Sequence, residues 1–155
     1  MLKHTIDFPL IGQLTMQGQR KIWEGRWGIP ELGQDDFNVI IYGELNGPTA
    51  AQQNVLQNFY QNRNEMSGRI CDELAAYLNS GEWDMPDLPE ITAANIWQFL
   101  NPETIMLDNP NDKRSYYGNG TDMLLSIGWL IGGLEDCGIQ IYLKNGTEFD
   151  GIGSE

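Results

Sequence analysis

The residue types that most often act as nucleophiles, bases or metal ligands are scarce in this chain. His4, near the N-terminus, is the only histidine that could activate a serine or a cysteine. Cys71 and Cys137 lack the Cys-x-x-Cys spacing of structural zinc sites. The glycine-rich stretches 118–120 and 151–153 lack the phosphate-binding motif of nucleotide sites. We therefore predict no catalytic centre, no metal ion and no cofactor.

Carboxylates are abundant, and paired carboxylates can hydrolyse glycosides. Asp35 with Asp36, and Glu135 with Asp136, are sequence neighbours on expected turns, where such charges are solvated. The stretch 108–112 is rich in Asp and Asn but lacks the spacing and terminal glutamate of a calcium loop, which indicates a solvated loop. The sequence thus favours a protein that is not an enzyme, with a carboxylate-dependent hydrolase as a remote alternative.

The segment from Glu82 to Glu90 contains four acidic residues and no basic residue. If its apolar side chains are exposed, Trp83 is an aromatic anchor inside a ring of charge, as in binding hot spots. Alternatively, Trp83 and Leu88 turn inward and hold the segment on the core. Both interpretations remain open from the sequence. The candidate partner-binding residues are Glu82, Trp83, Asp84, Asp87, Glu90, Asp35, Asp36, Glu135 and Asp136.

The net charge indicates the kind of partner. Twenty-two acidic residues against nine basic ones give a formal net charge of −13 and a pI of about 4.2. Such a surface repels nucleic acids and anionic membranes. It attracts basic proteins, with association rates raised by about 10- to 1,000-fold at low salt. We therefore predict a basic protein partner, although acidity also serves solubility alone.

Length and composition predict one folded domain over residues 1–155. The apolar fraction is 41%, and no apolar run is long enough to cross a bilayer. Asp7 and Pro9 interrupt the only apolar stretch near the N-terminus, which argues against a secretory signal. A cytoplasmic location follows, in which both cysteines stay free and Cys71 is a small core residue.

The first 45 residues have the alternation of β-strands. Residues 6–10 alternate in polarity, and a turn at Gln17-Gly18 precedes a strand over 21–27 with two tryptophans on one face. The stretch Val39–Tyr42 is apolar on both faces. We therefore predict that it is a central strand covered on both sides.

The period then changes to that of a helix. Thr49 and Gln52 form a capping box. Apolar residues recur at spacings of four and seven up to residue 78, which predicts an amphipathic helix of about 30 residues, or two helices broken near Ser67-Gly68. Gly81 is the expected C-terminal cap.

The second half adds a short helix over 93–100, ended by Pro102, and strands over 104–107 and 123–131. For the final hairpin, a three-residue loop ending at Gly146 pairs Ile141 with Phe149 and keeps the apolar side chains on one face. Together these elements predict an α+β fold. Its mostly antiparallel sheet, of about six to eight strands, packs against one long or kinked helix plus a short helix.

Short motifs carry a resemblance to a known group. They are Gly47-Pro48-Thr49 with Gln52, Asp136-Cys137-Gly138-Ile139-x-Ile141, Asn145-Gly146 and Gly151-x-Gly153. With the order of elements, they resemble small acidic bacterial domains grouped with immunity proteins of polymorphic toxin and contact-dependent growth-inhibition systems. Members of that group carry Glu-His-Gly where this chain has Asp136-Cys137-Gly138. Any role of that histidine is therefore missing here.

The resemblance implies a cytosolic protein that binds a toxin domain tightly and covers its active site or a neighbouring surface. Against a nuclease with a basic cleft, the acidic side chains would replace the phosphate backbone. Reversing Asp84 and Asp87 to Lys is then expected to slow association. An adaptor or regulatory module with another partner is the alternative, and gene neighbourhood distinguishes the two.

Overall fold

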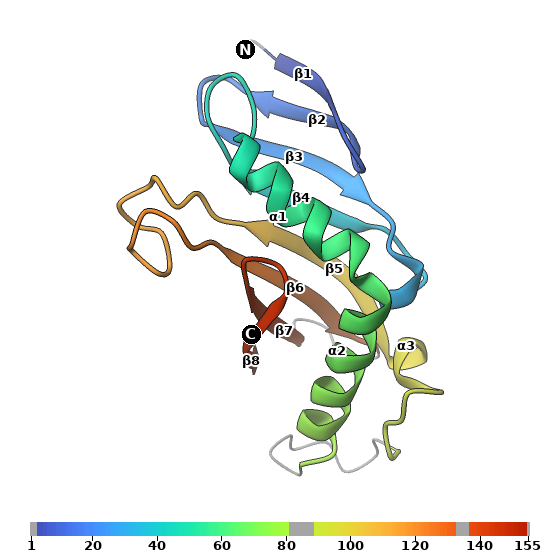
Figure 1. The fold of residues 1–155 in the computed structure, drawn as a ribbon. Coiled ribbons are helices and arrows are strands. Elements are labelled where there is room, and N and C mark those ends of the chain that lie inside the picture. Colours follow the sequence, from blue (N-terminus) through green and yellow to red (C-terminus); the bar gives the residue numbers. More distant parts are fainter. Residues whose placement is uncertain (1–2, 81–88, 133–136, 155) are drawn as a thin grey trace.

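A computed structural model describes residues 3–80, 89–132 and 137–154. Eight strands form one sheet in the order of the sequence (Figure 1). The strands are β1 (Lys3–Phe8), β2 (Gly12–Gln17), β3 (Ile22–Trp27), β4 (Phe37–Tyr42), β5 (Leu100–Leu107), β6 (Leu124–Ile131), β7 (Gly138–Lys144) and β8 (Glu148–Ser154). Neighbouring strands are antiparallel except β4 and β5, which are parallel. The predicted α+β class and the mostly antiparallel sheet are therefore confirmed.

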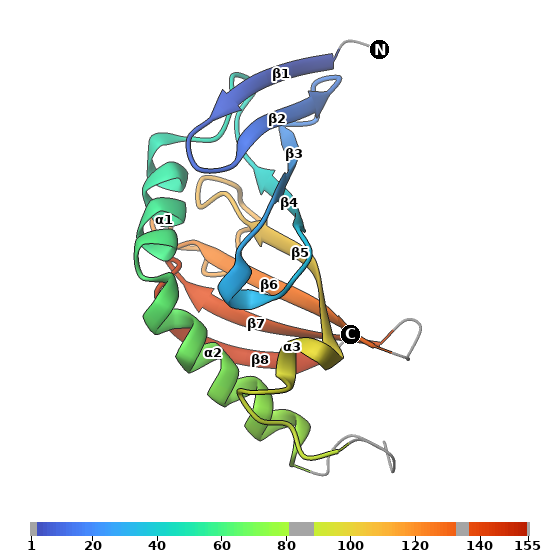
Figure 2. The same cartoon turned by 90° about the vertical axis from the view of Figure 1, so that its right-hand side faces the viewer.

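The helices connect the strands and cover one face of the sheet. They are the 3-10 helix η1 (Pro30–Leu32), α1 (Ala50–Gln61), α2 (Arg63–Leu78) and α3 (Ile96–Phe99). Because β4 and β5 are parallel, the chain must return from one end of the sheet to the other between them. The helices α1 and α2 make most of this crossover, and both lie on the same face (Figures 1 and 2). None of the described helices has the length and apolar composition that crossing a membrane requires.

The core lies between this covered face and the two helices. Trp23 and Trp27 are buried on the same face of β3, as predicted. The predicted strand over 123–131 is also confirmed as β6, and alternate residues from Met123 to Ile131 are buried. Packed against them are the apolar side chains of the helices, including Val55, Leu56, Phe59, Ile70 and Leu74. The buried Cys71 belongs to this core, and it and Cys137 are free, also as predicted.

The prediction that Val39–Tyr42 is covered on both sides is wrong for the described part of the chain. β4 is an internal strand, and Val39 and Ile41 are buried beneath the helices. Ile40 on the opposite face is only half-buried, and Tyr42 is exposed. Neighbouring side chains on the pleat, such as Met106 opposite Ile40, supply the partial burial of that face. An apolar outer face therefore does not require a second layer.

The predicted helix is divided, but not at Ser67-Gly68. The capping box at Thr49 and Gln52 is confirmed, and α1 ends at Gln61. Asn62 leaves helical geometry with φ −100° and ψ 15°, and its side-chain amide donates to the carbonyl oxygen of Asn58. Such local side-chain bonds compete with helix geometry. Gly68 stays inside α2, and the predicted cap at Gly81 lies outside the described residues.

The short helix predicted over residues 93–100 is α3, which is shorter than predicted. α3 begins at Ile96 because Thr92 and Asn95 form a side-chain turn before it. It ends before Leu100, which already has extended backbone. Pro102 therefore does not end a helix but lies inside β5, where the pairing with β6 shifts between Pro102 and Thr104. Proline lacks the N–H that a regular ladder needs, so it is found at such irregularities.

The predicted hairpin register is also wrong. Leu143, rather than Ile141, lies opposite Phe149, and the bulge falls at Asp150 instead of Gly146. The predicted face is nevertheless right, because Phe149 packs on the core beside Leu143. The bulge lets the hydroxyl of Tyr117 donate to the Asp150 carboxylate, at 2.6 Å between the oxygens.

Candidate functional surfaces

The connections gather at two opposite ends of the central strands, because each strand carries the chain from one end to the other (Figure 1). Described residues of three connections, 28–36, 79–99 and 132–137, lie at one end, which we call the acidic end and define by residues 28–36, 79–80, 89–99, 132 and 137. These three segments contain nine Asp and Glu residues and no Lys, Arg or His. The turns and loops 18–21, 43–49 and 108–123 meet at the other end, which we call the hollow end.

The candidate partner-binding residues that the structure describes lie at the acidic end. Asp35, Asp36 and Glu90 are all exposed there. The candidates Glu82, Trp83, Asp84, Asp87, Glu135 and Asp136 lie outside the described residues. The described residues on either side, such as Gly132 and Cys137, belong to this end, and the N–H of Ile131 donates to the carbonyl oxygen of Cys137 at 3.0 Å.

Trp129 holds the acidic end together. Its indole N–H donates to the carbonyl oxygen of Leu32 at 2.8 Å. Its ring lies 5.8 Å from the ring of Phe37 and 5.7 Å from the ring of Trp97, measured between centroids. These contacts join segment 28–36 to α3 through one fully buried side chain. A packed aromatic cluster therefore supports the segment that carries Asp35 and Asp36.

Close backbone packing also fixes segment 28–36. Gly33 has φ +145°, and a Cβ at this position would come within 2.5 Å of the Pro102 side chain. Only glycine fits this combination of conformation and space. Gly33 is thus held against Pro102 of β5, two residues before Asp35 and three before Asp36.

The carboxylates of the acidic end differ in their partners. Glu31 forms an ion pair with Arg63 at 3.0 Å, and the Arg63 guanidinium stacks on the ring of Tyr60. Asp35 and Asp36 form no ion pair with any described residue. Glu90 stands one residue before Ile91, whose backbone exchanges two hydrogen bonds with the Asn79 side chain. Exposed and unneutralised carboxylates are thus presented on an ordered backbone.

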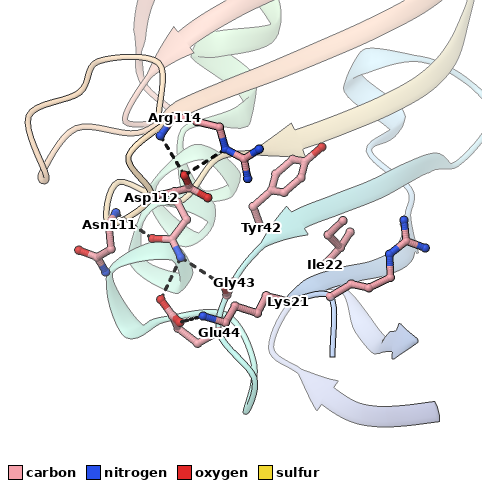
Figure 3. A pocket seen from close by; sticks show the side chains of 10 residues that line it. Lys21, Ile22, Tyr42, Gly43, Glu44, Asn111, Asp112 and Arg114 are labelled. Carbon is pink, nitrogen blue, oxygen red and sulfur yellow. Dashed lines mark hydrogen bonds and ion pairs between the residues drawn. The ribbon is translucent and has the colours of Figure 1, made fainter. Parts of the chain in front are cut away.

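The hollow end contains an open depression of about 390 Å³ (Figure 3). It is lined by Arg20, Lys21, Ile22, Tyr42, Gly43, Glu44, Asn109, Asn111, Asp112 and Arg114. Lys21 pairs with Glu44 at 3.7 Å, and Arg114 with Asp112 at 3.6 Å. Three cations and two carboxylates therefore face this hollow, in a chain whose net charge is −13. The sequence gives no local signal for this hollow, because residues 20–21 and 114 are far apart in the chain.

Two buried amides fix the walls of the hollow. Gln52, whose backbone and side chain form the capping box, also donates from its side-chain amide to the carbonyl oxygens of Tyr42 and Asp108, at 2.8 and 3.0 Å. Asn109 donates to the carbonyl oxygen of Gly43 at 3.2 Å and to the Glu44 carboxylate at 3.0 Å. Buried polar groups must be paired, so these bonds hold the loop against β4.

The prediction of a solvated loop over 108–112 is therefore wrong for its first residues. Asn109 is buried, and the Asp108 carboxylate accepts from the backbone N–H groups of Tyr116 and Leu124. Asp112 is exposed. The pKa of the Asp112 carboxyl is lowered, mainly by the hydrogen bond from the backbone N–H of Arg114 and less by the Arg114 guanidinium. Among the described residues, no three His, Cys, Asp or Glu side chains are grouped closely enough to hold a metal ion.

The chain belongs to a family described as a domain of unknown function, DUF6985, whose model matches residues 10–122. The matched region contains segment 28–36, the helices and, at the hollow end, residues 18–21, 43–49 and 108–122, and it stops before β6. Comparisons with curated proteins and with solved structures gave no match.

Proposed function

We propose that this chain is a cytoplasmic immunity-type protein that binds and neutralises a cognate toxin domain through its acidic end. The observation that carries the proposal is the charge of that end. The described connections of this end present Asp35, Asp36 and Glu90 at the surface. These described connections contain no basic residue. A surface of one sign recruits a partner of the opposite sign.

The construction of the acidic end supports a binding role. Trp129 and Gly33 fix the backbone that leads to Asp35 and Asp36, so little order has to be gained on binding. A preorganised surface loses less conformational entropy when it associates. The acidic side chains would then meet the basic cleft of a toxin and exclude its substrate. This chain would contribute no catalytic group to the complex.

The first experiment is a pull-down with this chain as bait, from cells that express the product of the gene immediately upstream. A stoichiometric complex that withstands about 0.15 M salt and dissociates more readily at about 1 M supports charge-steered binding. Recovery of a housekeeping protein instead would favour an adaptor or regulatory module. Recovery of no partner would contradict the proposal.

A growth assay then separates neutralisation from simple binding. Cells that express the upstream product alone should stop growing, and co-expression of this chain should restore growth. The double variant Asp35→Asn/Asp36→Asn should protect less well. Glu24→Gln/Glu148→Gln removes the same charge from two exposed carboxylates outside the acidic end and should protect like the unmodified chain.

A further inference from the structure

The hollow has the composition of an anion site. The side chain of Arg114 is 91% exposed, and the Arg20 guanidinium forms no ion pair with any described residue. The two ion pairs at the hollow are exposed and longer than 3.5 Å. Exposed pairs of this kind contribute little, so their cations can turn toward a ligand at small cost.

The geometry of Lys21 separates this hollow from an ordinary charged surface. Lys21 has φ 60°, a left-handed conformation that is uncommon for a residue with a Cβ. Its carbonyl oxygen accepts from the N–H of Gly43 at 2.8 Å, which holds the strained residue in place. Residues kept in such conformations cluster at binding sites.

The buried amides supply a second, independent observation. Gln52 and Asn109, the two polar residues buried in the described core, both bond to the walls of this hollow. Burying an amide is unfavourable unless its bonds are made, so these two residues fix the arrangement of β4 and the loop. The acidic end, in contrast, is built around the buried aromatic side chain of Trp129, which packs against Phe37 and Trp97.

The aromatic ring of Tyr42 lines one side of the hollow. Its side chain is partly exposed and points between Ile22 and Arg114 (Figure 3). A second hollow of about 240 Å³ is also lined by Tyr42, Asp112 and Arg114, and extends the surface toward Ser115. An aromatic ring can stack on an exposed tyrosine while an attached anionic group reaches the guanidinium.

We propose that the hollow binds a small ligand that joins an oxyanion to a planar ring. The oxyanion lies between Arg114 and the cations of residues 20–21, and the ring packs on Tyr42. When Arg114 turns to the ligand, Asp112 keeps the bond from the backbone N–H of residue 114, which is 2.9 Å long. The depression, at about 390 Å³, falls in the usual range of roughly 300–1,000 Å³ for small-ligand sites.

The oxyanion could be a phosphate monoester or a carboxylate, and two probes distinguish these sources. Phenyl phosphate and benzoate share the ring, and phenol is the neutral control. Amide resonances of the 17.5 kDa protein are followed during titration with each probe. We expect saturable changes at residues 21–22, 43 and 114, with a Kd on the order of 1 mM because the site is open. Tighter binding of phenyl phosphate identifies the phosphate source, and tighter binding of benzoate the carboxylate.

Matched variants separate a built site from general attraction. Arg114→Gln should weaken binding by about tenfold, the effect of losing one charge-assisted hydrogen bond. Lys113→Gln makes the same charge change at an exposed neighbour that does not line the hollow, and should alter the Kd less than about twofold. Tyr42→Ala should weaken both ring-bearing probes but leave binding of inorganic phosphate unchanged.

Three results would overturn the proposal: no saturable change with either anion, changes centred away from the hollow, or equal losses in Arg114→Gln and Lys113→Gln. The site is independent of the acidic end. The variant Asp35→Asn/Asp36→Asn should therefore bind phenyl phosphate as the unmodified chain does. Failure of one proposal leaves the other standing.

Discussion

The two ends of the sheet are held in different ways. At the acidic end, Trp129 packs against Phe37 and Trp97, and a single indole bond reaches Leu32. At the hollow end, the buried amides of Gln52 and Asn109 bond to backbone carbonyl oxygens. Apolar packing is non-directional, whereas hydrogen bonds fix positions and orientations.

The difference matches the two kinds of recognition that we propose. A charged protein surface needs ordered loops, but its carboxylates can adapt to a partner. A small-ligand site needs side chains in a defined arrangement, and buried hydrogen bonds supply it. In these two proposals, the same sheet offers a surface for a macromolecule at one end and a hollow for a small anion at the other.

The largest expected effect comes from the aromatic cluster. Trp129→Ala should lower the free energy of unfolding by about 3–5 kcal/mol, because it removes a fully buried indole and leaves a cavity. Chemical denaturation measures this change. Trp129→Phe keeps a ring and loses the bond to Leu32, so it should cost less. A loss below about 1 kcal/mol for Trp129→Ala would show that packing does not hold the acidic end.

The second effect concerns the hollow end. Gln52→Leu leaves the carbonyl oxygens of Tyr42 and Asp108 without their amide partner, and should lower the free energy of unfolding by about 2–3 kcal/mol. It should also abolish binding of phenyl phosphate under conditions where the variant remains folded. The control is Asn54→Leu, an exposed position on the same helix. Unchanged ligand binding in Gln52→Leu would contradict the proposed bracing role.

The smallest effect is a pH dependence at the hollow end. The Asn145 side-chain amide, followed by that of Asn119, lowers the pKa of the Asp122 carboxyl in the folded protein. A lowered folded-state pKa adds stability above the unfolded value, near pH 4, and this is lost as the pH falls through the folded pKa. Asp122→Asn should therefore destabilise at pH 7 and do so less at about pH 2. An equal effect at both pH values would contradict this linkage.

Local patterns were sufficient to predict several elements. The capping box follows from Thr49 and Gln52 alone, and the alternation over residues 123–131 defines a buried strand face. The hairpin register could not be predicted in this way. It depends on a bulge at Asp150, whose carboxylate meets Tyr117 from a distant loop.

Local sequence patterns were also insufficient to predict how the candidate surfaces are assembled. Asp35, Asp36 and Glu90 were identified from local composition, but only the strand topology places these described residues at one end of the sheet. The hollow had no local signal, because the parallel pairing of β4 with β5 brings the loop after Leu107 beside Tyr42 and Lys21. Non-local pairing thus determines which charges meet.

The most direct test of the account is the association rate between this chain and the upstream gene product at low salt, measured by surface plasmon resonance. Asp35→Asn/Asp36→Asn should slow association at least ~3-fold, because these charges help to steer the encounter. Glu24→Gln/Glu148→Gln, with the same net charge, should slow it much less. Equal rates for the two double variants would show that net charge alone acts, and would contradict a binding role for the acidic end.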